Sequence, residues 1–173
     1  MDISIIIINN NRENFIERSL RSCIDQIVFN KKFEIIFIDD GSTDNSYKIA
    51  KKFISSIKLY RLKKNMGISY ASNFALKKSK GKFFIRVDSD DFINKNTINH
   101  LHDVISYNED FAFVYCDHYR VDEFGYKEKV VKLKNKNILK NHGAGVMFNK
   151  KKFISYGGYN PKLKEAEDYE IIS

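Results

Sequence analysis

The first half of the chain alternates apolar runs with stretches in which apolar residues recur at helical spacing. Four runs predict β-strands, at 3–8, 33–38, 58–62 and 82–87. The first of them is continuous rather than alternating, which is typical of a strand covered on both faces. Helical spacing between the runs predicts helices over 12–27, about 44–56 and about 68–79. This alternation favours a parallel sheet with right-handed crossover connections.

The second half is less regular and predicts one longer helix followed by short strands. The helix covers about 95–107, and the strands lie at 111–121, 128–133 and 143–149, the first two joined by a turn at "EFGY". A short helix over "KKFISYGG" ends on its two glycines. Neither repeats nor a low-complexity linker interrupts the chain. We therefore predict a single domain over 1–173.

Size and composition are those of a soluble globular domain. The chain has 173 residues, of which 43% are hydrophobic and 30% are charged, and this length is enough to bury a core. The longest apolar run is far shorter than the roughly 20 residues that a membrane-spanning helix needs. The N-terminus lacks a signal-peptide pattern. Because Cys23 and Cys116 are the only cysteines, we expect no disulfide framework and predict a cytoplasmic protein.

The net charge of +8 comes mainly from lysine. Basic clusters around 134–140 and at 149–152 could contact phosphates, nucleic acid or an anionic membrane surface. The simpler interpretation is a solvated basic surface, and the sequence contains no nucleic-acid-binding motif. We therefore expect no nucleic-acid partner, and charge alone decides little about function.

Polar side chains follow three of the predicted strands, at the point where each strand ends. The clusters are Asn9–Asn11, Asp39–Asp40 and Asp88–Asp91. In open α/β sheets, ligands bind beyond the carboxyl ends of the strands. We therefore expect the three clusters to meet at one edge of the sheet and to form a binding site there.

The third cluster, in "FFIRVDSDDF", crowds carboxylates together and offers hard oxygen ligands. Mg²⁺ or Mn²⁺ binds through one or two carboxylates, while phosphate oxygens and waters complete its shell. A diphosphate leaving group needs such a cation to take up its developing negative charge. The alternative is that Asp91 merely caps the helix that starts near 94. Its position after the fourth strand favours a metal site.

The second cluster, in "FIDDGSTDNS", has a structural and a functional interpretation. Ser42, Thr43 or Asp44 would suit the N-cap of the next helix. Since one cap is enough, a carboxylate of Asp39–Asp40 could accept hydrogen bonds from a base or a sugar. The acidic "EAEDYE" at 165–170 is either a solvated helix face or the source of a general base, because a carboxylate can accept the proton of an attacking hydroxyl. No nucleophile motif of the G-x-S-x-G kind appears.

Four segments, in this order along nearly the whole chain, together resemble the family 2 inverting glycosyltransferases of the GT-A fold. They are "SIIIINNNRENFIERSLRSCIDQ", "FEIIFIDDGSTDNS", "NMGISYASNFALKKSKGKFFIRVDSDDF" and "GAGVMFNKKKFISYGGYNPKLKEAEDYEI". The resemblance implies an α/β fold with a mostly parallel central sheet flanked by helices and a Rossmann-like N-terminal half. Residues 1–92 would form the nucleotide-binding half, and 93–173 the acceptor-side half.

The resemblance also implies roles for individual residues. The donor-binding residues would be Asn9, Arg12, Asp40, Asp88 and Ser89. Asp40 would contact the nucleotide base, usually uracil, and Asn9 and Arg12 would border the same pocket. Asp88 and Ser89 would lie against the ribose and diphosphate. Asp90 would be the main ligand of Mn²⁺ or Mg²⁺. Asp168 would be the catalytic base that deprotonates the acceptor hydroxyl.

The implied function is transfer of a sugar from a nucleotide-sugar, a UDP-sugar in the first instance, to a glycan or lipid-linked acceptor in bacterial surface polysaccharide synthesis. The implied location is the cytoplasm, with peripheral association at the inner face of the membrane left open. A non-catalytic module that binds a nucleotide or a partner is the main alternative. A nucleotidyltransferase is a further one, although "NNNREN" is not the Gly-rich phosphate loop that it would need.

Three features depart from the family pattern. The first strand ends Ile8-Asn9-Asn10-Asn11-Arg12, where the family commonly has Pro-Thr-Tyr-Asn-Arg, so the aromatic beside the base is missing. Ser72 stands where the family often has an arginine. The chain also ends five residues after Asp168, which suggests a short member of the family or one module of a longer enzyme.

Overall fold

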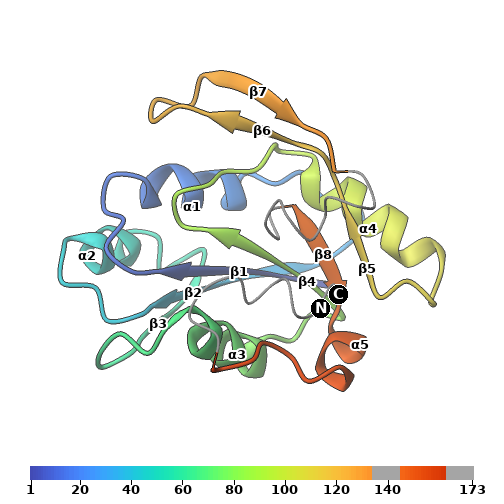
Figure 1. Ribbon diagram of the computed structural model, residues 1–173, viewed down its shortest axis with the longest axis horizontal. Helices are drawn as coiled ribbons and strands as arrows, with labels where there is room; N and C mark the ends of the chain where they lie inside the picture. The colour runs from blue at the N-terminus through green and yellow to red at the C-terminus, as the bar shows by residue number, and fades with distance from the viewer. Residues whose placement is uncertain (134–144, 163–173) are drawn as a thin grey trace.

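A six-stranded sheet forms the centre of the protein in the computed structural model, which describes residues 1–133 and 145–162 (Figure 1). In sheet order its strands are β3 (Lys58–Arg61), β2 (Phe33–Asp39), β1 (Ile3–Asn9), β4 (Phe83–Asp88), β8 (Val146–Asn149) and β5 (Phe113–Tyr115). The first four run parallel to one another, and β8 is antiparallel to both of its neighbours. The prediction of a mostly parallel central sheet is confirmed.

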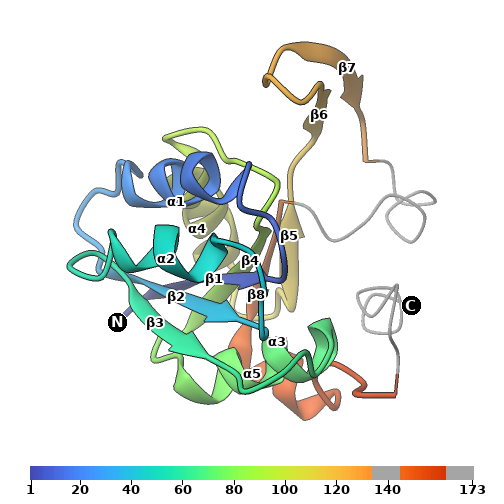
Figure 2. The ribbon, with the colours of Figure 1, turned by 90° about the vertical axis from the view of Figure 1, so that its left-hand side faces the viewer.

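Helices cover both faces of this sheet (Figure 2). On one face lie α1 (Ile16–Ile24), α2 (Ser46–Lys51) and α4 (Thr97–Tyr107). On the other lie α3 (Ile68–Lys78) and α5 (Lys150–Ser155). Among the helices of the described ranges, none is long and apolar enough to cross a membrane.

The isoleucine-rich β1 shows why the sheet is buried on both faces. All seven of its residues are buried. Successive side chains of a strand point to opposite faces, so Ile5 and Ile7 pack beneath α1 while Ile6 and Ile8 pack against the layer of α3. The continuous apolar run therefore supplies two cores at once, as the sequence predicts.

Two helices are shorter than the sequence predicts. The segment before α1 is not helical because its amides bond to the next loop: Arg12 N donates to Ser46 Oγ at 3.1 Å and Glu13 N to Asp44 Oδ2 at 3.0 Å. The chain after α2 continues in tighter i→i+3 turns, such as the bond from Phe53 N to Ala50 O. The apolar residues keep a helical periodicity through both segments, but the continuous hydrogen-bond series of an α-helix does not extend through them.

The run at 111–121 is two strands rather than the single strand predicted. Its first part is β5 in the main sheet, and its second part is β6 (His118–Val121), which pairs with β7 (Lys127–Val131) in a hairpin that stands away from the sheet above α1 (Figures 1 and 2). The chain changes sheets at Asp117, whose Oδ1 accepts a hydrogen bond of 2.9 Å from Leu133 N at the base of the hairpin.

Candidate active site

The three polar clusters meet at the carboxyl edge of the sheet, as predicted. In the strand register, Asn9 lies beside Asp39, and Ile8 lies beside Asp88. The strand β1 therefore separates the two acidic clusters by two strand spacings, which amount to about 10 Å. Residues far apart in sequence are brought into one site because parallel strands end together.

A pocket of about 700 Å³ opens at this edge, which is within the usual range for small-molecule sites. It extends from the ends of β1, β2 and β4 to the first turn of α3 and to Pro161 and Lys162. Of the six donor and metal residues that the sequence predicts, five line it: Arg12, Asp40, Asp88, Ser89 and Asp90.

The sixth residue, Asn9, lies beneath the pocket rather than in its wall. It is fully buried, and its Nδ2 is 3.0 Å from Ser42 Oγ and 3.4 Å from Asp39 Oδ1. Its neighbour Asn10 lines the pocket instead and donates from Nδ2 to Asp40 O at 2.7 Å. Asn9 supports the loop that carries the second acidic cluster.

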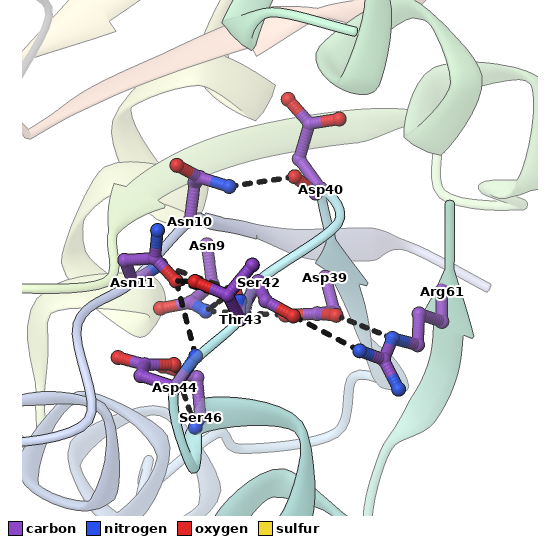
Figure 3. A network of polar contacts seen from close by, with 10 residues as sticks. All are labelled: Asn9, Asn10, Asn11, Asp39, Asp40, Ser42, Thr43, Asp44, Ser46 and Arg61. Atoms are coloured by element: carbon purple, nitrogen blue, oxygen red, sulfur yellow. Dashed lines mark hydrogen bonds and ion pairs between the residues drawn. The ribbon is translucent and has the colours of Figure 1, made fainter. Parts of the chain in front are cut away.

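The loop after β1 is bonded to the loop after β2 by side-chain amides and hydroxyls (Figure 3). Asn11 has a positive φ of 54°, a conformation in which asparagine is enriched among non-glycine residues. Its Oδ1 accepts from Thr43 N at 2.8 Å, and its own N–H donates to Ser42 Oγ at 3.0 Å. These bonds fix the two loops relative to each other, so the "NNN" segment has a structural role at the edge of the site.

The two aspartates that follow one another after β2 have different surroundings. Asp39 is fully buried and pairs with Arg61, whose Nε lies 3.1 Å from Asp39 Oδ2. Figure 3 shows the side chain of Asp40 pointing away from this pair. Asp39 is thus a structural residue, whereas Asp40 lines the pocket.

The carboxylate of Asp40 holds the loop that precedes α3. Its Oδ1 accepts from Met66 N at 2.8 Å and its Oδ2 from Gly67 N at 2.9 Å. Burial raises the pKa of Asp40 above its usual 3.8, and the charge of Asp39 adds to the rise, against the lowering effect of the two backbone hydrogen bonds. The same loop approaches Gly41 so closely that a Cβ there would lie 2.4 Å from the backbone carbon of Lys64.

Two carboxylates of the third cluster, those of Asp88 and Asp90, are paired with arginines. Asp88 Oδ1 lies 3.4 Å from Arg86 Nε, and Asp90 Oδ2 lies 3.1 Å from Arg12 Nε. Both side chains are nearly half exposed, at 44% and 46%. The alternative role of Asp91 as a helix cap is wrong, since α4 begins only at Thr97, its N-cap residue is Asn96, and Gln26 Oε1 accepts from Ile98 N in its first turn at 3.1 Å.

The donor set after β4 fits a hard divalent cation that takes most of its ligands from substrate and water. Mg²⁺ is commonly held in this way, through one or two carboxylates. Among residues 1–133 and 145–162, no group of three or more His, Cys, Asp or Glu side chains is placed to hold a metal ion alone. A cation here would therefore depend on phosphate oxygens as well as on Asp88 and Asp90.

Two other predicted features can now be placed. Asp168, with the rest of "EAEDYE", lies outside the described residues. Ser72 is fully buried and does not line the pocket. The sequence analysis did not single out Met66, Tyr70 and Lys162, which do line it. A signal for the first two was their position around Gly67, which directly precedes α3 and donates from its N–H to Asp40 after β2.

The chain matches the profile of the family described as Glycosyl transferase family 2 over residues 4–159. This match covers most of the chain, so the protein belongs to family 2 of the glycosyltransferases. The sheet with helices on both faces is correspondingly the GT-A fold of such enzymes.

Among curated proteins, the chain is similar to poly(ribitol-phosphate) beta-N-acetylglucosaminyltransferase TarS of Staphylococcus aureus. The two are 37% identical over 101 residues, which make up 57% of this chain and 18% of TarS. Crystal structures of TarS 1-349 in complex with UDP and with UDP-GlcNAc each have a TM-score of 0.79 and 26% identity, covering 99% of this chain. The matched regions make up 54% of the TarS chain solved with UDP and 52% of the one solved with UDP-GlcNAc. This chain therefore spans only part of the length of TarS.

The mannosyltransferase PcManGT from Pyrobaculum calidifontis, solved in complex with GDP-Man and Mn²⁺, has a TM-score of 0.76. Its sequence identity is 18%, over 96% of this chain and 50% of that one. At this level of identity the likeness shows the shared fold alone.

Proposed function

We propose that the protein transfers a glycosyl group from a UDP-sugar to a hydroxyl of a glycan or lipid-linked acceptor, with Mn²⁺ or Mg²⁺ as its cofactor. One observation carries the proposal: Asp40, Asp88 and Asp90 line a single pocket of about 700 Å³ in a family 2 glycosyltransferase. A nucleotide and a nucleotide-sugar are bound to the same fold in TarS, which was solved with UDP and with UDP-GlcNAc.

The two acidic parts of the pocket are suited to opposite ends of a nucleoside diphosphate. Asp88 and Asp90, with the buried Ser89 between them, would hold the cation and the diphosphate. Asp40, about 10 Å away across β1, would accept a hydrogen bond from the base. The bound cation would neutralise negative charge that develops on the departing diphosphate. Arg12 and Lys162, the cations of the described pocket lining, would attract the donor.

In the chemical step, the acceptor hydroxyl oxygen forms a bond to the anomeric carbon while the bond from that carbon to the diphosphate oxygen breaks. Attack from the face opposite the leaving group inverts the configuration, and the nucleoside diphosphate carries away the electron pair. In this proposal Asp168 accepts the proton of the hydroxyl. Alignment of the two substrates supplies much of the rate gain of such a step.

The acceptor and the location belong to the same proposal. The name of TarS specifies a poly(ribitol-phosphate) acceptor, and this relationship supports a role in bacterial surface polysaccharide synthesis. A net charge of +8 favours an anionic polymer or an anionic membrane surface near the protein. We place the protein in the cytoplasm, at the inner face of the membrane when its acceptor is lipid-linked.

A non-catalytic nucleotide-binding module is the second candidate. The observation that favours it is that Asp88 and Asp90, which would hold the cation, are each paired with an arginine. In an enzyme, the cation and the diphosphate must displace these pairs. In a non-catalytic module, the arginines could stay in place and balance the charge permanently.

Calorimetric titration of UDP, GDP and CDP, each with and without Mn²⁺, tests the proposal. The variants are Asp90→Ala and, as a matched control, Asp110→Ala, an exposed aspartate between α4 and β5. We expect UDP to bind in a Mn²⁺-dependent way to the wild-type protein and to the control but not to Asp90→Ala. Absence of binding by every nucleotide under both conditions would refute the transferase function for this chain.

A second measurement separates the enzyme from the non-catalytic module. The reaction, hydrolysis or transfer of UDP-sugars, is measured as the release of UDP by the wild-type protein and by Asp168→Asn. We expect UDP release only from the wild-type protein, and equal UDP affinity in both. Equal affinity with no release from either protein would favour the module.

A further inference from the structure

The pocket contains a single aromatic side chain among the described residues that line it. This residue is Tyr70, in the first turn of α3, and it is 43% exposed. The other exposed aromatic residues of the described part of the chain lie outside the pocket, where solvent contact needs no special explanation. An aromatic ring that is held on a helix and faces a cavity for a nucleotide is different, because it offers a ready surface for a base.

The end of β1 offers no such surface. Asn9, Asn10 and Asn11 follow one another there, and their amides are engaged in hydrogen bonds to the loop after β2. A nucleobase whose in-plane hydrogen bonds are made to polar groups still has two apolar faces to cover. The missing aromatic must therefore be replaced from another element, or the base stays exposed.

The position of Tyr70 places it near the base rather than near the diphosphate. Asp40, the expected base contact, binds the backbone N–H groups of Met66 and Gly67. Gly67 precedes α3 directly, and Tyr70 follows it by three residues, which puts both on the same side of the helix. Asp88, the last residue of β4, lies on the far side of β1, and Asp90 follows it by two residues.

We propose that Tyr70 is the surface on which the nucleobase of the donor stacks, with Met66 against the edge of the same base. Met66 also lines the pocket and is 43% exposed, and a thioether adapts readily to an aromatic edge. This inference rests on the proposed nucleotide-sugar donor and assigns a further binding residue to it. It explains how a site without an aromatic residue after β1 can hold a base.

Stacking on Tyr70 favours any base, since every base has a π-face. Discrimination between bases therefore depends on hydrogen bonds to the edge of the base, among them the one proposed for Asp40. Each of its carboxylate oxygens accepts one backbone hydrogen bond, and a carboxylate has about four acceptor positions in total. A remaining position can accept an N–H from the base, so in this proposal Tyr70 contributes stacking and Asp40 contributes a hydrogen bond.

Titration calorimetry with UDP and with inorganic pyrophosphate, both in the presence of Mn²⁺, tests the assignment. The proteins are wild type, Tyr70→Ala, Tyr70→Phe and, as a control, Tyr107→Ala at the exposed end of α4, where the side chain is 89% exposed. We expect Tyr70→Ala to weaken UDP binding about 5- to 150-fold, the range for loss of one base–aromatic stack. Its affinity for pyrophosphate, which has no base, is expected to stay unchanged. Tyr70→Phe keeps the ring and is expected to bind UDP like the wild type.

The outcomes separate this inference from the proposed function. Unchanged UDP affinity in Tyr70→Ala overturns the stacking role while the donor site stands. A parallel loss of UDP and pyrophosphate affinity overturns it as well, because the substitution would then disturb α3 rather than remove a stack. If no nucleotide binds to the wild-type protein, the proposed function fails and the role of Tyr70 fails with it.

Discussion

Arg12 Nε lies 3.1 Å from Asp90 Oδ2, so an ion pair joins the loop after β1 to the loop after β4. The backbone of Arg12 is fixed by the bond from its N–H to Ser46 Oγ, while its side chain is 50% exposed. Exposed pairs of this kind contribute only about 0–1 kcal/mol to stability. The value of this pair therefore lies in its position, since one partner is the proposed metal ligand.

Substitution of Arg12 by alanine is expected to change metal and nucleotide binding in opposite directions. Without the guanidinium, Mn²⁺ no longer competes with a positive charge for Asp90, so its affinity in the absence of nucleotide should rise about fivefold, equivalent to about 1 kcal/mol. Affinity for UDP should fall, because a cation near the diphosphate is lost. Calorimetry measures both, and Arg120→Ala on the exposed hairpin strand β6 serves as the control. Equal Mn²⁺ affinity in wild type and Arg12→Ala would show that the pair does not compete with the metal.

Gly41 is expected to be the least replaceable glycine of the described residues next to the site. Its φ is +68°, and a Cβ would lie 2.4 Å from Lys64 C and 2.6 Å from Asn65 N, both of which are backbone atoms. Gly157 has a φ of +105° but no atom within 4 Å of its Cβ position, so Gly157→Ala measures conformational strain alone, about 1–2 kcal/mol. We expect Gly41→Ala to cost about 2 kcal/mol more, as overpacking does, and to weaken UDP binding.

Urea denaturation of the two glycine variants, read as the free energy of unfolding, tests this prediction. Equal losses of stability in both variants would mean that the loop before α3 can move away from Gly41. In that case the close approach of this loop to the end of β2 would not be what shapes the pocket.

The raised pKa of Asp40 predicts how UDP affinity depends on pH. Burial, as the largest cause, lifts this pKa above 3.8, and only the ionised carboxylate can accept an N–H from the base with its full charge. As pH falls through the raised pKa, the carboxylate protonates and UDP binding weakens, starting at a higher pH than for an ordinary aspartate. The free energy of unfolding depends on pH in the opposite direction. A raised folded-state pKa means that protonation of Asp40 favours the folded protein, a contribution that is lost as pH rises through that pKa.

Titrations of UDP between pH 4.5 and 7.5 check the pH dependence, with Asp40→Asn as the comparison. Phosphate oxygens also protonate, with a pKa of about 6, and the variant reports their share alone. The excess weakening in the wild type at low pH is the contribution of Asp40. Superimposable pH profiles would assign the whole effect to the phosphates and remove Asp40 from base recognition.

The main-sheet strands β1–β4 could be predicted from sequence because each is a short apolar run bounded by polar residues. The predicted strands at 3–8 and 33–38 differ from β1 and β2 by a single residue at one end. Helix ends could not be predicted as well, since they depend on bonds between distant loops. The backbone N–H groups of Arg12 and Glu13 donate to the side chains of Ser46 and Asp44, and no local sequence pattern shows these bonds.

The convergence of the polar clusters at one edge of the sheet could be predicted from the parallel strands. The different roles of the residues within each cluster could not. Asn9, the last residue of β1, is fully buried, whereas Ile8 before it and Asn10 after it line the pocket. Such a shift of one position reverses the direction of a side chain. The sequence pattern did not indicate Tyr70, because its proposed role depends on the hydrogen bonds of Asp40 to Met66 and Gly67, which are 26 and 27 residues further along the chain.

The two cysteines give a direct test of the core between the sheet and α1. Cys23 is fully buried in that core, and burial raises its pKa to about 12. Cys116 is partly exposed beside Gly145, and burial raises its pKa as well. Only the thiolate reacts with a disulfide reagent. We therefore expect an Ellman titration at pH 8 to modify one thiol slowly in the folded protein and two rapidly in urea.

The Cys116→Ser variant should show no reaction until it unfolds, at a rate that reports the opening of this core. Rapid modification of Cys23 in the folded variant would mean that α1 does not pack on β1 and β4 as the structure shows.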